Sequence, residues 1–222
     1  MSVQLKHLRD DDAFAARLDE LGIELPYVDA AVAAAHLGRP VEAGRLAIGN
    51  RLCVLPMEGW DATAQGRPSE LVVRRWERFG ASGAKLVWGG EAFAVLPEAR
   101  ANPRQLCAGP HSVADLAMLR DRLGVAHRAA TGGTDGLVVG LQLTDSGRWS
   151  RPVDGFEPRV AYRHPLLDER VGAGDEHVLT DTMLDDLVGA FVAAAVTARE
   201  AGFDFVDVKH CHGYLQIGRA HV

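Results

Sequence analysis

Residues 201–215 read Ala-Gly-Phe-Asp-Phe-Val-Asp-Val-Lys-His-Cys-His-Gly-Tyr-Leu. The run at 205–208 is rich in β-branched and aromatic side chains and too apolar to face water on both sides, which predicts a strand of a parallel sheet. Lys209, His210, His212 and Tyr214 follow this strand. In parallel barrels the chemistry collects at the carboxyl ends of the strands, so we expect a functional site here.

Three earlier segments show the same order of strand and then helix. Strands are predicted at 52–55, 85–88 and 137–143, and helices at 69–79, from 112 towards 123, and after 182 up to Gly202. This alternation is typical of the α/β class with a parallel sheet. Residues 1–46 are predicted to be an N-terminal extension with one amphipathic helix at 13–21.

Local signals mark the starts of these helices. Ser69 is a predicted N-cap, and the pairs Ser112/Asp115 and Thr182/Asp185 have the spacing of a capping box. The last helix carries apolar residues at the i, i+3, i+4 spacing that predicts a buried stripe, namely Leu184, Leu187, Val188, Phe191 and Ala195.

Motifs stand at the ends of all four predicted strands. They are Asn-Arg-Leu-Cys-Val-Leu-Pro-Met at 50–57, Gly-Glu-Ala at 90–92, Gln-Leu-Thr-Asp-Ser-Gly-Arg at 142–148, and the stretch at 201–215. In this order they resemble the Old Yellow Enzyme family of NADH:flavin oxidoreductases, over residues 47–215. The resemblance implies a (β/α)8 TIM barrel truncated after about strand four, with residues 47–216 as the first half of the barrel.

The family resemblance also implies chemistry. It implies FMN as cofactor and NAD(P)H as electron donor, with hydride passed through flavin N5 to an activated alkene such as an enone or dienoyl thioester. By position, Lys209 and His212 match the pair that binds the substrate carbonyl, and Tyr214 matches the general acid. Pro56, Met57, Ala92 and Gln142 match residues that contact the flavin.

Two positions depart from the family pattern. Lys209 stands where the family usually has His, and Asp145 also replaces a His, for which we assign no catalytic role. An ammonium is a stronger point charge than a neutral imidazole, so Lys209 suggests a site that favours an anionic ligand.

Two other functions compete with the flavoenzyme. His210 and His212 could ligate a metal in a metal-dependent TIM-barrel hydrolase, because alternation along an extended strand puts both on one face. A half-barrel could also be non-catalytic and act only by pairing with another half.

Composition restricts the partners to small molecules. The net charge of −6 comes without a basic stripe, which argues against nucleic acid. The apolar stretch at 187–198 is too short for a membrane span. Three scattered cysteines and a polar N-terminus favour a reducing cytoplasm. Whether the parent enzyme is a homo-oligomer stays open.

The last residues form a separate feature. Residues 217–222, Ile-Gly-Arg-Ala-His-Val, do not continue the family pattern and resemble a translated sequencing adapter, which predicts a non-native tail. A complete barrel typically needs about 250 residues. We therefore expect the fragment to expose apolar surface, to aggregate, and to bind FMN weakly.

Overall fold

The computed structural model describes residues 7–215, so the tail predicted at 217–222 lies outside the described residues. The chain divides into two compact units, with the division between Arg39 and Pro40. The first unit holds helices α1 (Asp11–Leu21) and α2 (Ala30–Leu37). Each is capped by an aspartate, Asp10 or Asp29, and neither helix buries a residue. Helix α1 is the amphipathic helix predicted in the extension.

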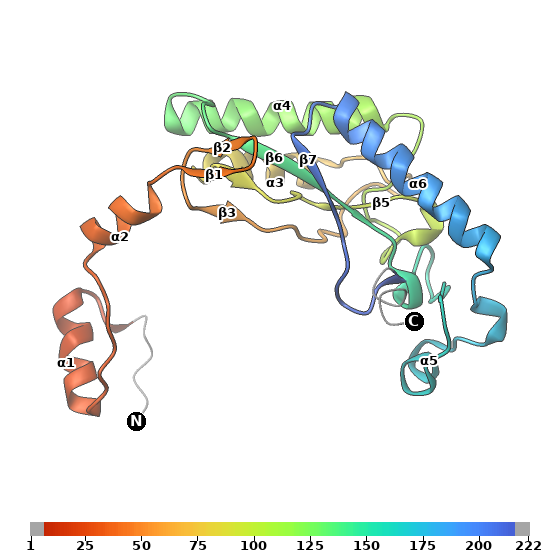
Figure 1. Cartoon of the computed structure of the whole chain (residues 1–222), viewed down its shortest axis with the longest axis horizontal. Helices are drawn as coiled ribbons and strands as arrows, with labels where there is room; N and C mark the ends of the chain where they lie inside the picture. Colours follow the sequence, from red (N-terminus) through yellow and green to blue (C-terminus); the bar gives the residue numbers. More distant parts are fainter. Residues whose placement is uncertain (1–6, 216–222) are drawn as a thin grey trace. The chain divides into compact units, whose positions relative to one another are not determined.

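The second unit opens with a hairpin of β1 (Val41–Ala43) and β2 (Leu46–Ile48) and then builds a parallel sheet (Figure 1). The strands of this sheet are β3 (Cys53–Val54), β4 (Leu86–Val87), β5 (Ala92–Ala94), β6 (Val138–Thr144) and β7 (Phe205–Val208). Strand β3 pairs with β4, both β4 and β5 pair with β6, and β6 pairs with β7. The predicted α/β class is confirmed, and the four predicted strands are found in sequential order across the sheet.

Strands β4 and β5 are two halves of one strand, interrupted by Gly89 and Gly90. Val87 is in register with Val139 and Ala92 with Gln142, so five steps on one strand match three on its neighbour. The two extra residues form a bulge in which Gly89 and Gly90 have φ of 85° and 53°. A Cβ on Gly90 would lie 2.7 Å from the ring of Trp76, so only glycine fits there.

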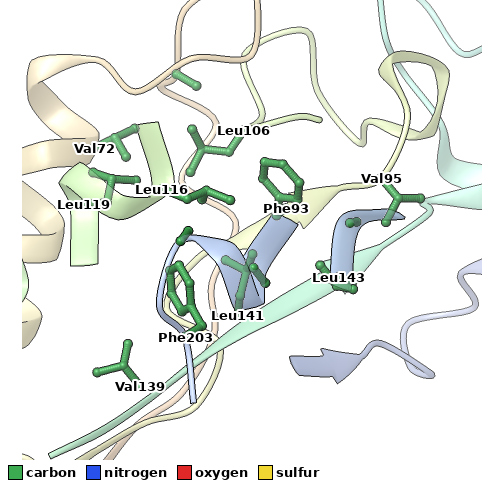
Figure 2. Packing of buried hydrophobic residues seen from close by; sticks show 14 of the residues in the cluster. Val72, Phe93, Val95, Leu106, Leu116, Leu119, Val139, Leu141, Leu143 and Phe203 are labelled. Atoms are coloured by element: carbon green, nitrogen blue, oxygen red, sulfur yellow. The ribbon is translucent and has the colours of Figure 1, made fainter. Parts of the chain in front are cut away.

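Helices cover one face of the sheet. They are α3 (Glu70–Ala81), α4 (Ser112–Thr131) and α6 (Asp181–Glu200); in Figure 1, α4 lies along the top and α6 runs from the top down the right-hand side. Figure 2 shows the core that they enclose, where Phe93 and Leu141 of the sheet meet Val72 and Leu116 of the helices. Helices α3 and α4 approach closely at Gly80, whose carbonyl oxygen lies 3.0 Å from Nδ1 of His127.

Of the three helix starts predicted from capping signals, that of α3 is found as predicted and those of α4 and α6 are not. Ser69 caps α3 as predicted, with its Oγ accepting from Val72 N. Helix α6 is capped by Thr180 instead of Thr182, which brings Asp181 into the first turn, where a negative charge is favourable. Both predicted capping boxes are therefore wrong.

At α4 the side chains have other partners. Ser112 Oγ accepts from Gly109 N at 2.8 Å, and Asp115 is bound by Arg67. Helix α4 also continues to Thr131, eight residues beyond the predicted Leu123.

The buried stripe of α6 is only partly as predicted. Leu184 and Leu187 are buried, and Phe191 and Ala195 pack against the core, but Val188 is 51% exposed. Val192, one helical turn after Val188, is exposed as well.

A second, smaller cluster is built around α5 (Pro165–Val171). Its central polar residue is Asp168, which is 2% exposed and accepts from Arg148 Nε at 2.7 Å and Arg163 Nε at 2.9 Å. Short 3-10 turns η2 (Pro97–Ala99), η3 (Gly147–Trp149) and η4 (Asp175–His177) complete the connections.

The sheet face opposite the helices carries aromatic and polar side chains. Gly140 and Phe205 are registered neighbours, and Trp88 contacts Phe205 edge-on with ring centroids 5.2 Å apart. Trp88 is 42% exposed, and Leu55, which follows β3, is 70% exposed. We call this the inner face. In the part of the chain that the structure describes, β3 and β7 each pair with one neighbour only.

Candidate functional site

The predicted site residues meet at one edge of the sheet, where the parallel strands end. Met57, after β3, forms a parallel bridge with Glu91. Ala92 in β5 is in register with Gln142 in β6, which is in register with Asp207 in β7. The segment after β7 holds Lys209, His212 and Tyr214. Pro56 lies beside Gly89, since a Cβ added to Gly89 would be 3.2 Å from the Cβ of Pro56. The strand order therefore brings together residues that are far apart in the sequence.

Glu58 connects the most reactive of these residues, and the sequence did not predict it. Lys209 Nζ donates to Glu58 Oε1 at 2.7 Å. The Tyr214 hydroxyl donates to the same carboxylate, 2.8 Å from Oε1 and 3.0 Å from Oε2. Trp60 Nε1 donates to Oε2 at 3.1 Å. The one available signal was its place two residues after Pro56, at a strand end.

Lys209 and Tyr214 also contact each other directly. The ammonium nitrogen lies 4.2 Å from the centre of the Tyr214 ring, a cation–π geometry. Both residues are buried, with 5% and 7% exposed. The ammonium that was predicted to favour an anionic ligand therefore already has a carboxylate and an aromatic ring as partners.

The surroundings raise the pKa of Tyr214 well above its usual value. Burial is the largest cause, and the charge and hydrogen bond of Glu58 add to it. Tyr214 thus stays a neutral phenol, with its O–H directed at the carboxylate.

The turn that carries Tyr214 is anchored on the loop after β6. Leu215 N donates to the carbonyl of Asp145 at 3.3 Å. Gly147 has a φ of 58°, and a Cβ there would lie 2.6 Å from Leu215 N. Asp145 itself is fully buried and accepts from Gly147 N, consistent with a structural role.

A cavity of about 300 Å³ opens beside Tyr214. Its walls are largely aromatic, and its lining includes Trp60, Trp149, Phe156, His212 and Tyr214. Trp60 and His212 have φ of 54° and 61°, the two non-glycine residues with positive φ in the described part of the chain. Strained backbone of this kind concentrates at functional sites. The His212 ring is exposed and edge-on to Tyr214, with centroids 6.0 Å apart.

Arg75 of α3 holds the loop after β3 in place. Its guanidinium binds Asp61 and donates to Glu91 Oε2 at 2.8 Å. A Cβ on Gly59 would lie 2.1 Å from Arg75 Nη1, so the loop packs directly on the guanidinium. Glu91 is fully buried, and burial raises its pKa against the opposing effect of Arg75.

The fit of this edge to a flavin rests on Gln142 and Met57. The Gln142 amide, which can donate and accept, donates to Asp207 Oδ2 at 2.7 Å. The Met57 side chain is 45% exposed. The main chain of Met57 is already paired, because its N–H donates to the carbonyl of Gly90 and its carbonyl accepts from Ala92 N. Ala92 is fully buried. The side chains of Gln142 and Met57, rather than the main chain of Met57, are therefore the groups that could contact a ring here.

The metal site is not favoured. Strand β7 ends at Val208, so the alternation that would align His210 with His212 does not extend to them. His210 Nδ1 lies 2.8 Å from the carbonyl of Val208. Within residues 7–215 there is no group of three or more His, Cys, Asp or Glu side chains that could hold a metal ion.

We compared the sequence and the structure of this chain with those of known proteins. No family model matches the chain. Over 80 residues it is 38% identical to an NADPH dehydrogenase of Clostridium acetobutylicum, covering 36% of this chain and 22% of the dehydrogenase.

Among solved structures, the Old Yellow Enzyme homologue of Zymomonas mobilis superposes with a TM-score of 0.62 at 22% identity, covering 81% of this chain and 49% of that one. Morphinone reductase superposes with a TM-score of 0.63 at 23% identity and the same coverage. An Old Yellow Enzyme solved with pHBA gives 0.64 at 24% identity, covering 82% and 53%.

The chain has the Old Yellow Enzyme fold. The resemblance predicted from the strand-end motifs is thus confirmed, and the Old Yellow Enzyme structures are TIM barrels of which this chain spans about half. Within the described residues, no helix is both long and apolar enough to span a bilayer.

Proposed function

We propose that this chain supplies the first four strands of an FMN-dependent oxidoreductase barrel that reduces an activated alkene at the expense of NAD(P)H. The observation that carries the proposal is the convergence of Lys209, Tyr214 and Gln142 at one sheet edge, beside an aromatic cavity. Bound FMN would supply the hydride transfer, accepting hydride from NAD(P)H and delivering it to the alkene. Gln142 and the side chain of Met57 would hold the ring, with Pro56 beside it.

The residues of the chain would bind and polarise the substrate. Lys209 and His212 can donate to a carbonyl oxygen, which stabilises the negative charge that develops there. Tyr214 keeps its proton at neutral pH and can deliver it from the cavity side once its hydroxyl leaves Glu58. The aromatic lining favours a planar, apolar substrate such as an enone or a thioester with a conjugated chain.

Spectroscopy on a complete barrel that contains this chain tests the function. We expect the purified protein to be yellow, with flavin absorbance, and to consume NADPH faster when 2-cyclohexenone is added. Lys209→Met and Tyr214→Phe should each lower that rate about 100-fold, within the range given for positioned acid–base groups. A colourless protein that contains zinc would contradict the proposal.

We also propose that the 222-residue chain alone is inactive. The inner face, on which a closed barrel would build its interior, is exposed at Leu55 and Trp88. Measurement of FMN fluorescence during titration with this chain checks the proposal, since stoichiometric quenching would contradict it.

A further inference from the structure

Glu58 receives hydrogen bonds from three side chains in two segments of the chain. The donors are Trp60 in its own loop, and Lys209 and Tyr214 beyond β7. The carboxylate is 11% exposed, and Lys209 is 5% exposed. The buried Lys209 ammonium and the buried Tyr214 phenol therefore share the oxygen atoms of one partly buried carboxylate.

We propose that Glu58 is a positioning residue, whose carboxylate fixes the Lys209 ammonium and the Tyr214 hydroxyl in one place and makes the cluster of three electrically neutral. That this cluster acts on a substrate rests on the proposed function. The hydrogen bonds that connect Glu58, Lys209 and Tyr214 do not depend on it.

The first consequence concerns the proton of Tyr214. A carboxylate that accepts the phenol proton stabilises the phenol and opposes the phenolate. With Glu58 made neutral, the strongest charge on Tyr214 would be the Lys209 ammonium above its ring, which favours the phenolate. Tyr214 should therefore ionise at lower pH when Glu58 loses its charge.

The second consequence concerns ligands. Lys209 alone would attract anions, but paired with Glu58 it leaves no net charge to do so. The native site should then prefer a neutral carbonyl compound over a phenolate, the reverse of what the lysine by itself suggests. Loss of the Glu58 charge should restore the preference for the anion.

Other groups that face Tyr214 must be counted in any pH experiment. Besides Glu58, they are Ser146 after β6, Lys209, Cys211 and His212 after β7, and Arg151 across the cavity. Glu58 and Lys209 are the members of this set whose charged atoms lie directly on the phenol or its ring.

Tyrosine ionisation provides a direct test, because the chain has three tyrosines, Tyr27, Tyr162 and Tyr214. We would follow tyrosinate absorbance from about pH 8 up to the highest pH at which the protein stays folded, well past the ordinary tyrosine pKa of about 10. In the wild type, one tyrosine should titrate after the other two, and Tyr214→Phe should remove that late step. In Glu58→Gln the late step should move down by at least about one pH unit, a tenfold change in the ionisation constant.

Controls separate this effect from unfolding. Glu169→Gln removes an exposed carboxylate on α5 and should leave the titration unchanged. Circular dichroism at each pH confirms that the protein stays folded. If Glu58→Gln does not fold, the wild type and Tyr214→Phe still decide, because a Tyr214 that titrates together with Tyr27 and Tyr162 overturns the inference.

The titration uses neither flavin nor substrate. A failure of the proposed function would therefore leave the late tyrosine step in place. Conversely, an unchanged late step in Glu58→Gln would overturn the role of Glu58 even in a protein that binds flavin.

Discussion

At the scale of single residues, buried ion pairs connect the loops of this protein. Asp168 accepts from Arg148, Arg163 and the main-chain N–H of His164. Burial alone would raise the pKa of Asp168, but these hydrogen bonds outweigh it and lower the pKa from 3.8 to about 2. The folded state therefore favours the ionised carboxylate.

The lowered pKa of Asp168 predicts a pH dependence of stability. A carboxylate whose pKa is lower in the folded state stabilises the fold above its unfolded pKa, and this contribution is lost as pH falls from about 4 towards 2. We expect Asp168→Asn to be less stable than the wild type at pH 6, and to lose less stability over that acidic range. Urea unfolding at several pH values measures this, and parallel curves for the two proteins would contradict it.

Arg75 allows a second prediction at this scale. Arg75→Met leaves the fully buried Glu91 without its guanidinium, and removal of one partner of a buried pair costs about 3–5 kcal/mol. The matched control is Arg74→Met, which removes an exposed arginine from the same helix and should change the free energy of unfolding by less than about 0.5 kcal/mol. Similar losses in both variants would show that the Arg75–Glu91 pair is not responsible.

Single residues also show where sequence reasoning stops. The polar residues after β7 could be predicted as a site because strand ends carry chemistry. Glu58 could not, although it lies within the same kind of segment, because its partners Lys209 and Tyr214 are 151 and 156 positions away. No local pattern reports a pairing over that distance.

At the scale of elements, strands β3, β4, β6 and β7 and most helices followed from hydrophobic patterning, whereas two of the three predicted helix starts were wrong. Thr180 and Thr182 are both suitable N-cap residues, and spacing to Asp185 pointed to the second. Helix α6 uses the first, whose Oγ accepts from Met183 N, and Asp181 then lies in the first turn of the helix.

The position of this cap can be checked by mutation. Thr180→Ala should cost about 1 kcal/mol, because it removes the oxygen that accepts from Met183 N. Thr182→Ala, inside the first turn, should cost less than about 0.5 kcal/mol, as alanine has the higher helix propensity. Thermal unfolding of both variants measures the difference, and the reverse order would place the cap at Thr182.

The bulge between β4 and β5 makes another prediction. Gly90→Ala should destabilise the protein by at least about 2 kcal/mol, since it combines a left-handed backbone with a clash against Trp76. Gly132→Ala is the matched control, because Gly132 has a φ of 85° and nothing within 4 Å of an added Cβ. That variant should show the cost of backbone strain alone, about 1 kcal/mol. Equal losses for the two glycines would show that Trp76 does not restrict the bulge.

At the scale of the whole molecule, the exposed inner face should control solubility. Leu55 and Trp88 lie on this face, and contiguous exposed apolar surface promotes association. Leu55→Glu should lower concentration-dependent light scattering several-fold without lowering the melting temperature. Leu166→Glu, which changes an exposed leucine on α5, is the control. Equal suppression by both variants would show that the inner face has no special part in association.

The pairing of Glu58 with Lys209 also determines when the site can exist. Closing a loop of 151 positions has an entropic cost that must be met before the contact stabilises anything. The Glu58 carboxylate therefore has neither Lys209 nor Tyr214 as a partner until β7 has docked on β6. Burial of Tyr214 should accordingly be among the last events of folding, and tyrosine absorbance in stopped-flow refolding would report completion of the site after the helices have formed.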